Sequence, residues 1–295
     1  MNIILEEDNE RSSLFESSKN LSGVFERMKS IQVIEDGDIY LGIEAFFEKD
    51  CTKARIGYKI YKNNDYVDVD VTLFLGDIDK IIKLKIPVCM SGDFIGQTAF
   101  GTEKLFMDAR KNVAHRFVAV ENGEKALALM NTSVYGNHFE NGTIYMSLVR
   151  GATYCTHPIE DRQLFPLGRF TKKIDQGENT YSFRLGLVER KHLERMTQEF
   201  VQKPYGLNIF PIRTEHHVST AFNVSLEDDV ISVVTIKKAD NREAIIFRLM
   251  NNTESQIETA LNVNEARLNL IFNKYEVKTV LYEGQKLFEE KELII

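Results

Sequence analysis

Strict alternation of apolar and polar residues, the period of a β-strand, dominates the chain. In residues 66–74, YVDVDVTLF, an apolar residue at every second position falls on one face and polar residues fall on the other. Residues 80–87, KIIKLKIP, repeat the pattern, and Lys83 and Lys85 are expected to face solvent. Further strands of this kind are expected at residues 40–47, 55–61, 115–120, 126–130, 143–149 and 179–188. Because no helical pattern separates them, an antiparallel sheet is predicted rather than βαβ units.

One helix and a second group of strands follow. Residues 189–202 carry apolar side chains near helical spacing, and Pro204 ends the predicted helix. Short strands then resume at residues 230–237, 244–250, 256–263, 266–273 and 277–282. The pattern predicts three parts: a linker or arm at 1–30, where no strand is obvious, a large β-sandwich at 31–204, and a small β-sandwich at 205–295.

Composition narrows the class of protein. The chain has 295 residues, 43% of them hydrophobic, as expected for a globular protein of about two domains. A net charge of −7 argues against nucleic acid or anionic lipid as partners. No apolar run reaches the length of a membrane span, and no secretory signal is recognisable. The three cysteines lack paired spacing and are expected to be buried or half-buried free thiols in a reducing cytosol, so a cytoplasmic location is predicted.

Familiar catalytic motifs are missing. Neither a glycine-rich phosphate loop nor a GxSxG nucleophile turn occurs. The His138 to Glu140 spacing is that of zinc deaminases, but no Pro-Cys-x-x-Cys follows. Asp68 and Asp70 share a strand face and suggest paired carboxylates for glycoside chemistry, although the solvated side of a sheet is the favoured interpretation.

The densest cluster of polar side chains lies between two predicted strands, at residues 150–163. Such a loop on a rigid β scaffold is a common place for binding groups. Arg162 can hydrogen-bond sugar hydroxyls or a carboxylate, and Tyr154 offers a flat ring with a polar tip. Alternatively, the loop is held together by its own ion pairs, with Asp161 paired to Arg150 or Arg162.

Several motifs occur in a fixed order. They are IGQTAFG at 95–101, NVAHRFVAV at 112–120, ALALMNTSVYG at 126–136, SLVRGATY at 147–154 and DQG at 175–177. This series resembles the C-terminal β region of glycoside hydrolase family 38, the α-mannosidases, in their bacterial branch. The resemblance spans roughly residue 31 to the C-terminus.

The resemblance implies a fold, and it implies that catalysis belongs to another domain of the parent enzyme. It implies an all-β chain with a large antiparallel supersandwich of the galactose mutarotase type, one short helix and a smaller β-sandwich. The parent enzymes hydrolyse α-mannosidic bonds with retention, using an aspartate nucleophile and a zinc ion on an N-terminal α/β domain that has no match here. The chain is thus expected to hold no catalytic residue, metal or cofactor of its own. The match to an arginine-bearing loop makes Tyr154, His157, Asp161 and Arg162 the candidates for supporting the sugar pocket, although residues 163–174 resemble an insertion.

Three functions remain in competition. The first is the C-terminal part of an α-mannosidase, inactive alone and partnered by the N-terminal catalytic domain and mannosides. The second is a stand-alone carbohydrate-binding or interaction protein, against which the absence of tryptophan counts. The third is a mutarotase-like epimerase, for which His115 and His157 are the histidines available. A sandwich separated from a catalytic partner is expected to expose an apolar patch, which a homodimer would cover.

Overall fold

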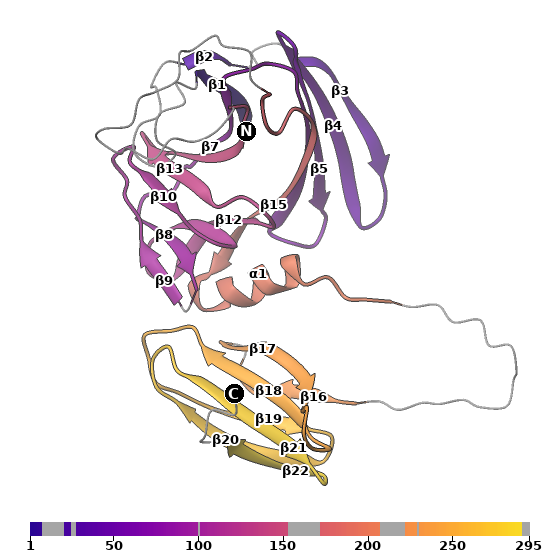
Figure 1. Ribbon diagram of the computed structural model, residues 1–295, viewed down its shortest axis with the longest axis vertical. Coiled ribbons are helices and arrows are strands. Elements are labelled where there is room, and N and C mark those ends of the chain that lie inside the picture. Colours follow the sequence, from indigo (N-terminus) through magenta and orange to yellow (C-terminus); the bar gives the residue numbers. More distant parts are fainter. Residues whose placement is uncertain are drawn as a thin grey trace, which may run out of the picture. The chain divides into compact units, whose positions relative to one another are not determined.

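The fold consists of antiparallel β-sheets with a single short helix among the described residues (Figure 1). The computed structural model describes residues 1–7, 21–24, 28–99, 101–152, 172–206, 222–228 and 230–290. Contacts divide the chain into two compact units, Met1–Arg190 and Lys191–Ile295. The predicted all-β class is confirmed. In the described ranges no helix has the length and apolar character needed to cross a membrane.

The first unit contains a nine-stranded and a six-stranded sheet. In spatial order, the nine-stranded sheet is β3 (Met28–Asp36), β4 (Tyr40–Lys49), β5 (Thr52–Tyr61), β6 (Tyr66–Leu75), β15 (Gly177–Glu189), β12 (Lys125–Asn131), β11 (Phe117–Glu121), β8 (Asp93–Thr98) and β9 (Gly101–Lys104). The six-stranded sheet is β10 (Lys111–Val113), β13 (Gly136–Glu140), β14 (Thr143–Arg150), β7 (Lys80–Pro87), β1 (Asn2–Glu7) and β2 (Leu21–Val24).

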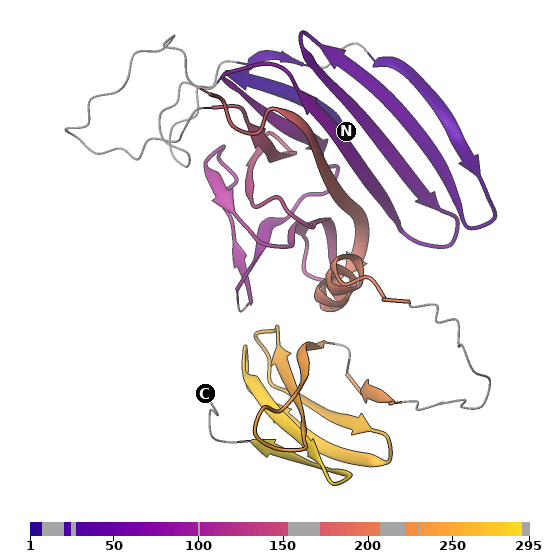
Figure 2. The same ribbon diagram turned by 45° about the vertical axis from the view of Figure 1, so that its right-hand side comes forward.

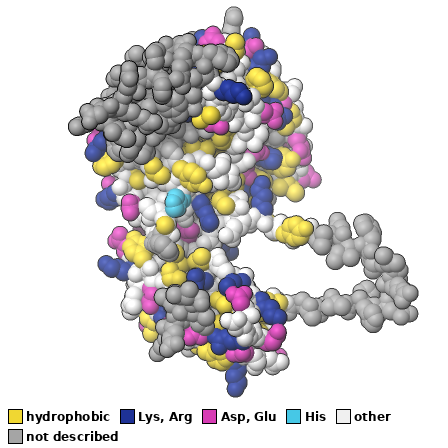
Figure 3. Space-filling model, in the orientation of Figure 1, with side chains coloured by type: hydrophobic (Ala, Val, Ile, Leu, Met, Phe, Trp, Pro, Cys, Tyr) yellow, Lys and Arg dark blue, Asp and Glu magenta, His cyan; other side chains and the backbone are white. Residues whose placement is uncertain are grey.

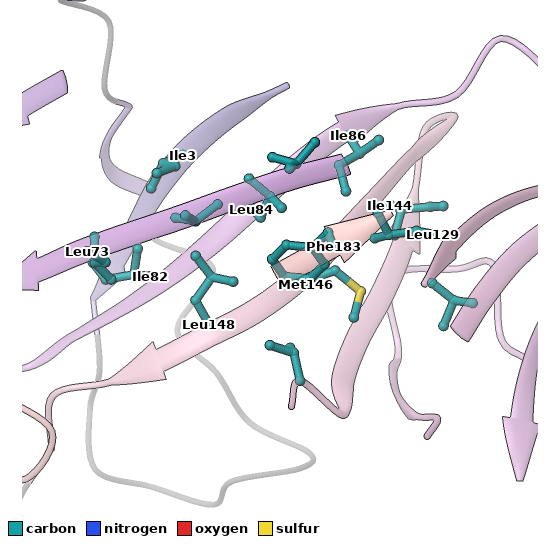
Figure 4. Close-up of a cluster of buried hydrophobic side chains, with 14 of the residues drawn as sticks. Ile3, Leu73, Ile82, Leu84, Ile86, Leu129, Ile144, Met146, Leu148 and Phe183 are labelled. Atoms are coloured by element: carbon teal, nitrogen blue, oxygen red, sulfur yellow. The ribbon is translucent and has the colours of Figure 1, made fainter. Parts of the chain in front are cut away.

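The core of this unit lies between the two sheets. Alternation sends Leu73 of β6 and Phe183 of β15 inward from one sheet, and Ile82 and Leu84 of β7 inward from the other. Figure 4 shows these side chains converging with residues of β1, β12 and β14. Each is at most 1% exposed, so each contributes about 1.5–3 kcal/mol of transfer free energy. The alternation read from the sequence therefore identifies the core-facing positions of these strands.

The second unit begins with a 3₁₀ turn at Arg190–His192 and helix α1 (Leu193–Val201), close to the predicted helix. Two small sheets follow. They contain β16 (Val224–Leu226), β19 (Ile257–Val263) and β20 (Ala266–Phe272) in one, and β17 (Ile231–Lys238), β18 (Ile245–Asn251), β21 (Val277–Glu283) and β22 (Lys286–Glu290) in the other. Buried residues such as Phe247 and Phe272 form a core of their own. Acidic and basic side chains are interspersed over the visible face (Figure 3).

Several expectations need correction. Residues 2–7 form β1, an inner strand of the six-stranded sheet, although no strand was obvious there, because three consecutive apolar residues hide the alternation. Lys83 faces away from the core as expected, but it is 1% exposed rather than solvated. The thiols of Cys51 and Cys89 are exposed, not buried, because both lie just outside strands; Cys155 falls outside the described residues.

Candidate functional site

The side chains that the sequence predicts for a sugar pocket lie on the segment between β14 and β15. Tyr154, His157, Asp161 and Arg162 all fall in residues 153–171, outside the described part of the chain. The structure does describe where this segment leaves the sandwich and where it rejoins it. The candidate site is therefore built from these two anchor points and from the charged side chains beside them.

Both anchor points are held at the turn between β6 and β7. The carbonyl of Gly151, directly after β14, accepts a hydrogen bond from the amide of Asp79 at 3.1 Å. The amide of Ile174 donates to the carbonyl of Ala152 at 3.0 Å, so the two ends of the segment are hydrogen-bonded to each other. Lys173 adds an ion pair with Asp79 at 2.7 Å. The scaffold thus fixes the described residues on both sides of the segment that carries the predicted pocket residues.

A buried ion pair lies on the outer face of the six-stranded sheet, opposite the core. Because Ile82 and Leu84 point into the core, Lys83 between them points to the other face of β7. Its ammonium donates to the carboxylate of Glu6 on the neighbouring strand β1. The side chain of Lys83 is 1% exposed and that of Glu6 is 12% exposed. A charge pair with so little access to water is strongly coupled, because the surrounding medium screens it weakly.

More positive charge surrounds this pair. Burial, and next to it the charge of Lys83, lower the pKa of Lys111 on β10 to about 7. Arg150, the last residue of β14, lowers the pKa of Lys111 further, whereas Glu6 raises it. Arg150 is also next to Gly151 in the chain, so the positive cluster adjoins the anchor of residues 153–171. We call Lys83, Lys111 and Arg150 the cationic cluster, and Glu6 is its counter-ion.

His138 borders the cationic cluster and stays neutral. Its ring stacks on Tyr145 of the adjacent strand, with centroids 4.4 Å apart and an angle of 1° between the planes. Burial first, and then the charges of Lys83 and Lys111, lower the pKa of His138 to about 3. Its Nδ1 atom is buried and has no hydrogen-bond partner among the residues that the structure describes. In the spacing of His138 and Glu140 seen in the sequence, the histidine is thus a buried ring stacked on Tyr145.

This arrangement supplies hydrogen-bond donors and positive charge. Retaining hydrolysis requires two carboxylates about 5–5.5 Å apart. Beside the cationic cluster, Glu6 provides the carboxylate that pairs with Lys83. No group of three or more His, Cys, Asp or Glu side chains in the described ranges is placed to hold a metal ion. The described residues therefore do not fit a zinc site.

The other candidates from the sequence occupy structural positions. Asp68 forms a two-pronged ion pair with Arg184, at 2.6 and 2.9 Å, and Arg184 also lies over the ring of Tyr66. Asp70 accepts from Ser182 at 2.7 Å. Both carboxylates are thus engaged on the outer face of the nine-stranded sheet, as the favoured interpretation anticipated. His115 makes an edge contact with Tyr135, and its expected companion His157 is outside the described residues.

Nothing in the local sequence pattern indicates the cationic cluster or its counter-ion. Glu6 lies where no strand was recognised, and Lys83 alternates with apolar residues in the same way as Lys85. Lys111 belongs to a three-residue strand that leaves almost no periodic signal. No local pattern distinguishes these residues from ordinary surface charges, since their burial arises from strands that are distant in sequence.

Comparison with known proteins identifies a family that matches this chain. The family profile described as "Glycosyl hydrolases family 38 C-terminal domain" matches residues 5–161. The match includes Tyr154, His157 and Asp161 and ends one residue before Arg162. A search of curated proteins finds no match.

Two solved structures from Enterococcus faecalis share the fold. One is a protein in the glycosyl hydrolase family 38, with a TM-score of 0.78 and 12% identity. The other is an α-mannosidase from strain V583, with a TM-score of 0.78 and 13% identity. In both cases 96% of this chain is covered, but only 40% and 38% of the respective solved chains. This chain therefore spans about two fifths of the length of these relatives.

Proposed function

Because the chain belongs to the family of glycosyl hydrolase family 38 C-terminal domains, we propose that it is the C-terminal β portion of an α-mannosidase. The observation that carries this proposal is the superposition of 96% of the chain on 38% of an α-mannosidase. In this view the remaining polypeptide of the parent enzyme supplies the aspartate nucleophile and the zinc ion and hydrolyses α-mannosidic bonds with retention.

The contribution of this chain is to support the mannoside pocket of its catalytic partner. The hydrogen-bonded anchors at Gly151 and Ile174 hold the ends of the segment that carries Tyr154, His157, Asp161 and Arg162. A segment fixed at both ends loses less conformational entropy when it binds, which favours a positioning role. The proposed pocket residues are these four, with Arg162 donating to sugar hydroxyls or a carboxylate.

A complementation assay tests the division of labour. The chain is assayed on an aryl α-mannoside with added zinc, alone and together with a separately produced family 38 catalytic α/β domain that lacks its own β portion. We expect no turnover from the chain alone and clear turnover from the mixture. Zinc-dependent turnover by the chain alone would contradict the proposal, and so would an unchanged rate in the mixture.

Substitution of Arg162 tests the pocket. Arg162→Ala is expected to lower kcat/KM of the mixture at least about tenfold, the value of one lost charged hydrogen bond. Arg162→Lys keeps the charge but not the planar fork and is expected to recover only part of the rate. Lys172→Ala, an exposed residue at the end of the same segment, is the matched control and is expected to leave the rate unchanged.

Calorimetric titration with mannose and mannobiose separates this proposal from a stand-alone carbohydrate-binding protein. A pocket that lacks the side chains of the catalytic partner binds free sugar weakly. We therefore expect that millimolar sugar does not saturate the chain alone. Saturable binding without any catalytic partner would favour the stand-alone alternative. A cytoplasmic location remains a prediction from the sequence.

A further inference from the structure

Strand β3 forms an open edge of the nine-stranded sheet. It pairs with β4 on one side, no described strand pairs with its other side, and it ends the sheet in Figures 1 and 2. All nine of its residues are exposed, and Ile31, Val33 and Ile34 are 57%, 61% and 58% exposed. Residues 30–34 carry no charge, which makes this edge a template for pairing with another strand.

The side-chain directions along β3 are symmetric about Gln32. Gln32 lies opposite Glu44 of β4, on the outer face of the sheet, while its neighbours Ile31 and Val33 lie opposite Ala45 and Ile43 on the core side. Two bulges in the β3–β4 ladder then interrupt the alternation, one on each side of Gln32.

At each bulge two consecutive residues of β3 face outward instead of one. Before Gln32, Ser30 pairs with Phe46 and Lys29 reaches Glu48, so residues 29 and 30 both face outward. After Gln32, the side chains of Ile34 and Glu35 both lie within 3.3 Å of where a Cβ on Gly42 would be, so residues 34 and 35 also both face outward. Read in either direction, residues 28–36 give the same sequence of core-side and outward positions.

We propose that β3 pairs antiparallel with β3 of a second copy of this chain, around a two-fold axis at Gln32. Residues directly opposite each other in an antiparallel pair must share a face, and a two-fold axis requires a residue to face its own counterpart. With the axis at Gln32, Ile31 faces Val33 on the core side and Lys29 faces Glu35 on the outer side. With the axis at Ile31 or Val33, outward residues would oppose core-side residues.

Charge favours the same arrangement. Lys29 stands at one end of the uncharged run, and Glu35 and Asp36 stand at the other. Antiparallel pairing places Lys29 of each copy against Glu35 of its partner, which gives two attractive pairs. Parallel pairing would oppose like charges at both ends, which destabilises a ladder. The pairing also brings four apolar side chains, Ile31 and Val33 of both copies, together on the core-side face.

Disulfide trapping tests the register. In the full chain with Cys51, Cys89 and Cys155 changed to Ser, Gln32→Cys places two thiols on the axis, where Cα atoms of opposite residues are about 4.5–5.5 Å apart. That spacing is within the range of a disulfide. Ser30→Cys is the matched control on the same strand face, because the two copies of residue 30 are offset by four residues, about 13 Å. We expect a covalent dimer from Gln32→Cys and none from Ser30→Cys; the reverse, or equal trapping of both, overturns the proposal.

A charge exchange tests the pairing without a crosslink. Sedimentation equilibrium of the unmodified chain is expected to show a reversible dimer, and a monomer up to 100 µM would overturn the proposal. Lys29→Glu turns two attractive pairs into repulsive ones and is expected to weaken the dimer about tenfold. The double variant Lys29→Glu with Glu35→Lys restores opposite charges and is expected to return to within about twofold. Because the exchange does not repair the contact of residue 29 with Glu48, rescue reports on the partner's Glu35.

Discussion

The buried pair of Glu6 and Lys83 provides the sharpest test of the cationic cluster. Glu6→Gln removes the carboxylate and leaves the ammonium of Lys83, 1% exposed, next to the positive charges around Lys111. Leaving one member of a buried pair without its partner costs about 3–5 kcal/mol. We therefore expect the free energy of unfolding of the first unit to fall by about that amount.

Lys83→Met is expected to cost less, about 1–2 kcal/mol. Methionine keeps the length of the buried stem, and the remaining carboxylate of Glu6 still interacts with Lys111. Glu6 also keeps some access to water, since its side chain is 12% exposed. The double variant, Glu6→Gln with Lys83→Met, has no uncompensated ammonium at position 83. Its loss in free energy of unfolding should therefore be about 2–3 kcal/mol smaller than the sum of the two single losses.

Urea unfolding followed by far-ultraviolet circular dichroism measures these costs. The chain has no tryptophan, so tyrosine fluorescence serves as the second probe. Hydrogen exchange of the β7 and β1 amides assigns the transition to the first unit. Additive single costs, or a Glu6→Gln variant no less stable than Lys83→Met, would refute the view that this pair is buried and coupled.

Three further predictions concern pH and backbone space. The pKa of Lys111 is lowered in the folded protein from its ordinary value of 10.5 to about 7. Between these two pH values the unfolded chain binds more protons than the folded chain, so the free energy of unfolding should rise with pH. Lys111→Met should flatten this rise in urea titrations. The pKa of His138 is also lowered, so stability should fall as pH drops from 6.5 towards 3. His138→Phe keeps the stacked ring and removes the Nδ1 atom, which has no hydrogen-bond partner in the described part of the chain. In urea unfolding this variant should be about 1–2 kcal/mol more stable and should lose less stability in acid. A Cβ at Gly76 would lie 2.2 Å from the carbonyl oxygen of Cys51, whereas a Cβ at Gly57 would lie 3.9 Å from the carbonyl oxygen of Asp70, an ordinary contact. Thermal unfolding should therefore show Gly76→Ala losing more than about 2 kcal/mol of stability and Gly57→Ala gaining about 0.5 kcal/mol; equal effects would contradict this.

Local patterning was a good guide to the strands. Period-2 alternation located β6 and β7 nearly to the residue, because each strand has one face in the core and the other away from it. It failed for β1, whose consecutive apolar residues Ile3, Ile4 and Leu5 are all buried and so give no alternation. It also failed for β3, which is exposed along its whole length and has no core to impose a pattern.

The sequence by itself determined the positions of strands with one face in the core, such as β6 and β7, the all-β class and, through the ordered motifs, the family. It did not determine which charges are buried. Lys83 and Lys85 are equivalent in the local pattern, and only the pairing of β7 with β1 brings Glu6 beside Lys83. The symmetric order of core-side and outward residues along β3 likewise depends on the bulges in its pairing with β4. Burial and register are properties of contacts between distant segments, so tertiary structure alone decides them.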